Sequence, residues 1–116
     1  MITRIQTVYV PADDVDAVAQ FYEGILGIKP RFRDGDRWVQ FSIANAGFAI
    51  ACKEESAEGA SGPVIVFEAS EDADHERLLA MGAIALGERD MGSHGRTRTY
   101  LAPGEQLIQL LWRSVP

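Results

Sequence analysis

The order of strand and helix patterns in the first half of the chain is repeated in the second half. Each half has one strand pattern, then a helix pattern that ends at a glycine, then three more strand patterns. The two glycines, Gly27 and Gly82, are 55 positions apart, which is about half of the 116 residues. Solenoid repeats are shorter than this, so the repeat predicts two modules packed across a pseudo-two-fold axis. Concave seams between modules are places where small ligands bind.

The chain is predicted to form a single domain, 1–116, with a first module at 1–53, a linker at 54–62 and a second module at 63–116. Alternating apolar and polar residues predict strands, and apolar residues at helical spacing predict helices. In the first module we expect strands at Ile5–Val10, Arg31–Arg33, Arg37–Ile43 and Phe48–Cys52, with a helix that ends at Leu26. In the second module we expect strands at Val64–Phe67, Ile84–Leu86, Thr97–Leu101 and Leu107–Trp112, with a helix that ends at Met81.

Capping and turn residues indicate where these elements begin and end. The pair Asp13-Asp14 is expected to supply the N-cap of the first helix, and Gly27 suits a left-handed C-cap. Ser70 is expected to cap the second helix. The pair Asp34-Gly35 is typical of a type I′ hairpin turn.

Composition and charge exclude several classes of protein. The net charge of −6 argues against nucleic-acid binding, which needs a basic face. Arg31, Arg33 and Arg37 are interpreted as charged residues that guard a hairpin edge. No apolar run is long enough to span a bilayer and no leader is present, so we expect no membrane partner. A single cysteine, Cys52, fits the reducing cytoplasm.

Two short motifs resemble the vicinal oxygen chelate superfamily, which includes glyoxalase I, extradiol dioxygenases and the bleomycin and fosfomycin resistance proteins. The segment FYEGILG at 21–27 is similar to the family's helix end. The segments GR at 95–96 and YLAPG at 100–104 are similar to its final hairpin, with Ala102 where aspartate is usual. The resemblance implies an α+β fold in which two βαβββ modules form an incompletely closed, U-shaped mixed β-barrel with helices outside.

The resemblance also implies where a divalent metal ion would be held. The corresponding positions fall on Ile5 or Gln6, near Ala51, on Pro63 and on Gln109. Ala51 and Pro63 have no ligating side chain, and the remaining amides are neutral. Because divalent cations need convergent nitrogen or oxygen donors, no metal cofactor is expected. The alternative is a reduced metal site formed by Gln6, His94 and Gln109.

A second set of residues is expected to bind a small molecule. Aromatic side chains with a few amide, hydroxyl and guanidinium groups suit a planar molecule that has polar edges. The candidate ligand-binding residues are Tyr9, Trp38, Gln40, Phe48, Phe67, His94, Arg98, Tyr100 and Gln109. Phe48 and Phe67 also fit the simpler interpretation of core residues, and His75 is expected at the surface. Gln40 and Gln109 lie within apolar strands, where an amide buried without a partner costs free energy.

These observations lead to two functional hypotheses. The first is a metal-independent binding protein that holds a small aromatic or amphipathic molecule in the cleft between the modules. The alternative is a metal-dependent lyase, isomerase or dioxygenase, so whether the chain is an enzyme, and which residues would be catalytic, is left open. A third possibility is a domain that serves mainly as a dimer partner or regulatory subunit. We also expect a homodimer in which Trp38 and Trp112 are covered by the second copy.

Overall fold

The computed structural model describes residues 1–113 and divides the chain into two compact units. We name each unit after its helix. The α1 unit is Thr7–Pro63, and the α2 unit combines Met1–Gln6 with the residues from Val64 onward. The first strand, β1 (Ile2–Ala12), begins in the α2 unit and ends in the α1 unit.

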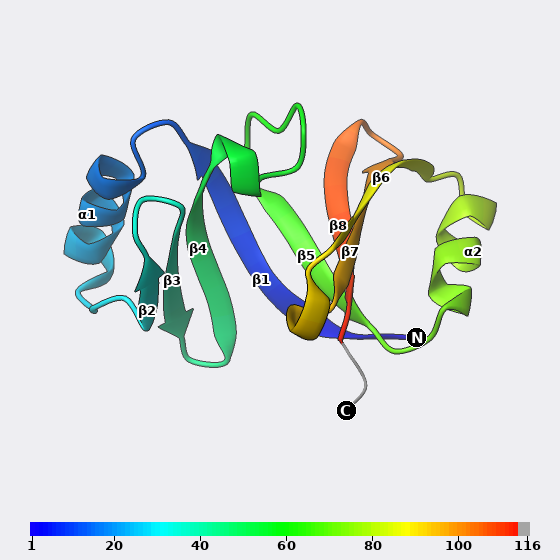
Figure 1. Cartoon of the computed structure of the whole chain (residues 1–116), viewed down its shortest axis with the longest axis horizontal. Coiled ribbons are helices and arrows are strands. Elements are labelled where there is room, and N and C mark those ends of the chain that lie inside the picture. Colours follow the sequence, from blue (N-terminus) through cyan, green and yellow to red (C-terminus); the bar gives the residue numbers. More distant parts are fainter. Residues whose placement is uncertain (114–116) are drawn as a thin grey trace. The chain divides into compact units, whose positions relative to one another are not determined.

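The α1 unit contains one helix and four hydrogen-bonded strand segments. After β1 come α1 (Val15–Leu26), β2 (Phe32–Asp34), β3 (Trp38–Ile43), β4 (Ala46–Cys52) and a short 3-10 helix, η1 (Lys53–Glu55). The strand order is β2-β3-β4-β1. β3 is antiparallel to both β2 and β4, whereas β4 is parallel to β1. Figure 1 shows α1 beside these strands.

The α2 unit repeats this arrangement. Its elements are β5 (Val64–Ala69), α2 (Ala73–Ala80), β6 (Ile84–Asp90), the 3-10 helix η2 (Gly92–His94), β7 (Arg96–Ala102) and β8 (Gln106–Trp112). The strand order is β1-β5-β8-β7-β6. β5 is parallel to β8, and β7 is antiparallel to both β8 and β6. In each unit, therefore, the strand before the helix pairs in parallel with the last strand.

The predicted α+β fold with two βαβββ modules is confirmed. Hydrogen-bonded neighbours give the full order β2-β3-β4-β1-β5-β8-β7-β6, so the mixed sheet has free ends at β2 and β6 and does not close. All ten predicted elements are present, and most extend by one to four residues beyond the ranges expected from sequence. Strand ends are hard to predict because turn residues can still pair with a neighbouring strand.

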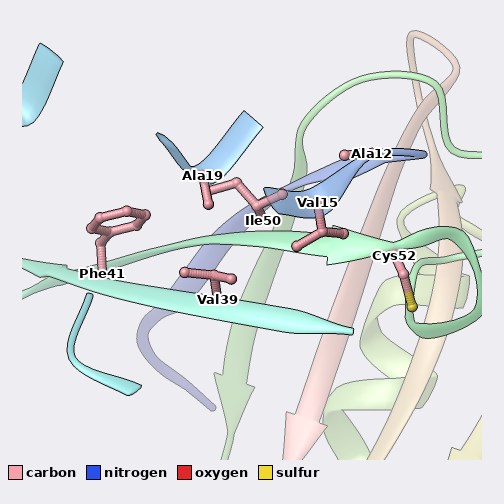
Figure 2. Packing of buried hydrophobic residues seen from close by; sticks show 7 residues of the cluster. All are labelled: Ala12, Val15, Ala19, Val39, Phe41, Ile50 and Cys52. Carbon is pink, nitrogen blue, oxygen red and sulfur yellow. The ribbon is translucent and has the colours of Figure 1, made fainter. Parts of the chain in front are cut away.

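The core of the α1 unit lies between α1 and one face of its strands. Figure 2 shows the side chains that pack there. They are Ala12, Val15, Ala19, Val39, Phe41, Ile50 and Cys52. Val39, Phe41 and Ile50 are fully buried. Alternate residues of β3 and β4 supply this cluster, so the residues between them lie on the opposite face of the sheet.

The core of the α2 unit has the same design. Its buried residues are Ala69, Ala83, Tyr100, Leu110 and Trp112, with Phe67, Leu78 and Ile108 packed against them. Leu78 comes from α2, and the others come mainly from β5, β7 and β8. Gly95 precedes β7 with a φ of 99°, and a side chain there would collide with the carbonyl oxygen of Trp112. Glycine is therefore required where β7 begins beside β8.

Helix ends confirm some capping predictions and correct one. The Asp14 carboxylate accepts a hydrogen bond from the Ala17 N–H at 3.0 Å, and Gly27 is left-handed with its N–H donating to Glu23. Ser70 does not cap α2, because its hydroxyl is bonded to the backbone of Met1 and the helix begins after Asp72. Within residues 1–113, no helix has the length and apolar character needed to cross a membrane.

The hairpin between β2 and β3 also differs from its prediction. Asp34 pairs with Trp38, so three residues connect the strands rather than the two of a type I′ turn. Gly35 has a φ of 51°, and the Arg37 N–H donates to the Asp34 carbonyl. Arg33 forms an ion pair with Asp16, and Arg37 forms one with Glu55. These pairs support the interpretation of the arginines as charged edge residues.

Candidate functional site

The helix-free face of the α1 unit brings together three residues that were predicted from sequence. Trp38 and Gln40 alternate with the core residues of β3, so they lie on the face opposite α1. Tyr9 lies on this face too, because it is opposite Ala49, whereas the next residue of β4, Ile50, packs against α1. We call Tyr9, Trp38 and Gln40, together with Thr7, the Trp38 cluster.

Hydrogen bonds hold the polar groups of the Trp38 cluster in place. The indole N–H of Trp38 donates to Oε1 of Gln40 at 2.9 Å. Nε2 of Gln40 donates to the hydroxyl of buried Thr7 at 3.2 Å and to the backbone carbonyl of Phe41 at 3.2 Å. The Gln40 amide thus uses both its acceptor and its donors within the protein. Its main physical effect is to fix the orientation of the half-buried indole ring.

Tyr9 completes this cluster as a neutral aromatic group. Its ring centre lies 5.4 Å from that of Trp38, with an angle of 55° between the planes. Its hydroxyl oxygen accepts a hydrogen bond from the Ala57 N–H at 2.8 Å. Burial raises the pKa of the Tyr9 hydroxyl, and the Ala57 hydrogen bond offsets part of that rise. The phenol therefore stays protonated at neutral pH and can act as an apolar wall.

In the α2 unit, Gln109 occupies the corresponding helix-free face. Its neighbours Ile108 and Leu110 pack against the α2 core, so Gln109 points to the other side of β8. Nε2 of Gln109 donates to the hydroxyl of Thr99, its direct partner on β7, at 2.9 Å. The free-energy argument that singled out Gln40 and Gln109 thus has the same answer in both units: each amide has a threonine hydroxyl as partner.

Four other candidate residues lie on the helix-facing side of their unit. Phe48 packs against the α1 core, with its ring centre 4.8 Å from that of Tyr22. Phe67 and Tyr100 belong to the α2 core, and Tyr100 is fully buried. Arg98 lies on the same side, because it alternates with residues of the helix-free face. The structure therefore does not place Phe48 with Trp38, or Tyr100 with Gln109.

A shallow hollow lies beside α2 in the α2 unit. It has a volume of about 490 Å³ and is lined by Asp72, Ala73, His75, Glu76, Arg96 and Arg98. Ion pairs join Arg96 to Asp72 and Glu88, and Arg98 to Glu88. His75, which was expected at the surface, is half-buried, and its Nδ1 lies 2.7 Å from the Tyr100 hydroxyl. Burial raises the pKa of Tyr100, although nearby Arg98 acts in the opposite direction.

Trp112 differs from its expected place at a subunit contact. Only 6% of its surface is exposed, and its indole N–H donates to the Glu71 carbonyl at 2.8 Å. The guanidinium groups of Arg96 and Arg98 lie 5.2 and 5.4 Å from its ring centre. Trp112 is therefore already covered within the α2 unit and does not need a second copy.

The donor set at the implied metal positions does not fit a divalent cation. Gln6, His94 and Gln109 all belong to the α2 unit, but they supply two neutral amides and one imidazole, without a carboxylate. His94 is exposed in η2, between two positive-φ glycines. Among residues 1–113, no group of three or more histidine, cysteine, aspartate or glutamate residues converges as metal ligands would. No chemical step through a metal ion is derived from these residues.

Sequence reasoning missed four residues that matter for this geometry. Thr7 and Thr99 are the partners of the two glutamines, Ala57 is bonded to Tyr9, and His75 contacts Tyr100. The two threonines carry a usable signal, since each is a β-branched polar residue in an alternating strand. Ala57 and His75 carry none, because their contacts join segments far apart in sequence.

Solved structures establish the relation of this fold to known proteins. A glyoxalase/bleomycin resistance protein/dioxygenase superfamily member from Vibrio splendidus 12B01 matches with a TM-score of 0.68, covering 95% of this chain and 99% of that one at 14% identity. The chain has the fold of that superfamily. Methylmalonyl-CoA epimerase from Mycobacterium tuberculosis matches with a TM-score of 0.72, covering 98% of this chain and 90% of that one at 20% identity.

A third similar structure carries a different description. It is an NAD-dependent benzaldehyde dehydrogenase from Legionella pneumophila, with a TM-score of 0.76 and 16% identity, covering 93% of this chain and 98% of that one. No protein-family model and no curated protein sequence matches the chain. At these identities the likeness concerns the glyoxalase-like fold, which hosts more than one chemistry.

Proposed function

We propose that this chain binds a small aromatic or amphipathic molecule without a metal ion, and that the molecule rests against Trp38. The observation that carries this proposal is the hydrogen-bonded frame around the indole. Gln40 accepts from the Trp38 N–H and donates to Thr7, so the polar edge of the ring is satisfied within the protein. What the indole offers to a ligand is its apolar face, which suits stacking with a planar ring.

The neighbouring residues support the same class of ligand. Tyr9 adds a second neutral ring beside Trp38, and the small residues Ala49 and Ala51 lie opposite Gln40 and Trp38 on β4. A wall made of aromatic and small side chains, with few polar groups, is typical of sites for apolar or amphipathic molecules. Metal independence is supported by the donor chemistry described above, in which Ala51 and Pro63 supply no ligand.

The proposal is tested with the amphipathic aromatic probe 8-anilinonaphthalene-1-sulfonate. Binding is followed by probe fluorescence, with and without an excess of EDTA. We expect the same affinity in both conditions, and we expect Trp38→Ala to weaken binding about tenfold or more, since a stacked ring is worth roughly 1.4 kcal/mol. Ser42→Ala is the matched control, because Ser42 is exposed on the same face of β3.

Two results would contradict the proposal. Loss of binding with EDTA, together with stoichiometric zinc, nickel, manganese or iron in protein purified without chelators, would favour the metal-dependent alternative. Equal probe affinity for wild type, Trp38→Ala and Ser42→Ala would place the probe elsewhere. Near-ultraviolet circular dichroism of each variant checks that probe binding does not report a loosened core.

A further inference from the structure

The outward face of α1 is apolar although it does not contact the core of its unit. Phe21 and Ile25 are 61% and 70% exposed, whereas Val15 and Ala19 on the opposite side of the helix are buried. Phe21 and Ile25 are four residues apart, so they are neighbours on one helical stripe. The Phe21 ring is held edge-on against Tyr22, with ring centres 5.1 Å apart. Two adjacent large apolar side chains at this exposure indicate a surface that binds another protein.

Gly24 lies between these side chains and leaves a gap on the same face. No atom lies within 4 Å of the place where a side chain on Gly24 would begin. Glycine inside a helix costs stability relative to alanine, and its φ is not in the left-handed region, so local backbone geometry does not require it. A gap next to a protruding phenylalanine is self-complementary, because the ring of one copy fits the gap of another.

Charges at the two ends of α1 indicate the direction in which two copies would pair. Asp14 and Asp16 are exposed at the N-terminus, and Lys29 and Arg31 are exposed just beyond the C-terminus. In an antiparallel pair, the register that faces Phe21 with Gly24 also faces Asp16 with Lys29 and Asp14 with Arg31. A parallel pair would instead place like charges, and like helix-dipole ends, together.

We infer that the outward face of α1 is a self-association surface, on which α1 of a second copy packs antiparallel with Phe21 of each copy over Gly24 of the other. Such a contact is isologous and closes with two-fold symmetry. One helix pair buries less than a standard interface of about 1,600 Å², so the dimer is expected to be weak and to depend on concentration. Its charge contacts are exposed, so salt should weaken it.

Sedimentation velocity over about 5 to about 500 µM protein tests this inference, because mass action separates a weak dimer from a monomer. We expect a concentration-dependent dimer for the wild type. Phe21→Glu should raise its dissociation constant at least about 100-fold, because it removes two buried rings from the contact. Met81→Glu is the matched control: Met81 is also a large exposed apolar residue, 79% exposed, but it follows α2.

Gly24→Gln gives a second variant whose two effects have opposite signs. It fills the gap, so it should also weaken the dimer about tenfold or more, while it replaces a helix-interior glycine and therefore should not lower the melting temperature of the monomer. A wild type that stays monomeric over the whole range would overturn the inference. So would a dimer that withstands Phe21→Glu and Gly24→Gln, or one that dissociates with Met81→Glu instead.

Discussion

At the scale of single residues, the two buried glutamines act on their neighbours rather than as free binding groups. Gln40 joins Trp38 to Thr7, and Gln109 is bonded to Thr99. A hydrogen bond from a side-chain amide adds little to stability overall, but removing one partner leaves the other with an unmet need. Gln40 is therefore a positioning residue, whose substitution should be felt through Trp38.

Gln40→Ala should lower the free energy of unfolding by about 1–3 kcal/mol, because the Trp38 N–H and the buried Thr7 hydroxyl both lose a partner. Urea denaturation measures this change, and tryptophan fluorescence in a Trp112→Phe background reports on the freed indole. Ser42→Ala should stay within about 0.5 kcal/mol of the wild type. Equal stability of the two variants would show that Gln40 does not hold Trp38.

Gln109→Glu should not create a tight metal site. The substitution adds one carboxylate, but Ala51 and Pro63 still supply no donor, and a divalent cation needs several converging ligands. Titration calorimetry with zinc and manganese should therefore show only weak binding. A submicromolar dissociation constant for this single variant would prove the donor argument wrong.

At the scale of elements, α1 is specified more strongly by its own sequence than α2 is. α1 has twelve residues, an aspartate N-cap and a left-handed glycine C-cap. α2 has eight residues, and no side chain caps its N-terminus by a hydrogen bond. The acidic residue that matters in α2 is Asp74, which is bonded to groups outside the helix as well as within it. α2 thus depends on tertiary contacts for a stabilisation that α1 obtains locally.

Asp14→Ala should lower the free energy of unfolding by about 1 kcal/mol, since the N–H of Ala17 loses its capping oxygen. Asp13→Ala is the matched control, because Asp13 is also exposed but lies one residue before the cap. Urea denaturation at neutral pH compares the two. An equal loss for both variants would mean that general charge at the helix N-terminus, rather than the cap, supplies the stability.

At the scale of the whole molecule, Asp74 connects the beginning of the chain to its second half. Its carboxylate lies 2.9 Å from the N-terminal ammonium of Met1 and 2.6 Å from Nη1 of Arg77, and it accepts from the Glu71 N–H at 3.1 Å. Burial by itself would raise the pKa of Asp74, but the hydrogen bonds from Met1, Glu71 and Arg77 outweigh it and lower that pKa. The ionised carboxylate is therefore the form that stabilises the fold.

Asp74→Asn should cost about 2 kcal/mol at pH 7, and this cost should shrink as the pH falls. The pKa of Asp74 is lower in the folded state, so its stabilisation is complete above the ordinary aspartate pKa of about 4 and disappears as the folded carboxylate takes up a proton. Urea denaturation at pH 7 and at about pH 3 measures the difference. Glu76→Gln, an exposed change on the same helix, should show no such convergence.

Local patterns in the sequence determined the element order, the two-module repeat, the α1 caps and the grouping of Tyr9, Trp38 and Gln40. Each of these depends on residues close in sequence or on simple alternation along one strand. Which face each strand presents depends on register, since a shift by one residue reverses every side chain. Tyr100 pairs with Ile108, and this register alone places Tyr100 and Gln109 on opposite faces.

Contacts between distant segments were decided only by the tertiary structure. Gln40 and Thr7 are 33 residues apart, Ala57 and Tyr9 are 48 apart, and Met1 and Ser70 are 69 apart. No periodicity encodes such pairs, because they form only after strands and loops have been brought together. For the same reason, Ser70 has the composition of a helix cap but is bonded to Met1 instead: a long-range partner competed with the local one and won.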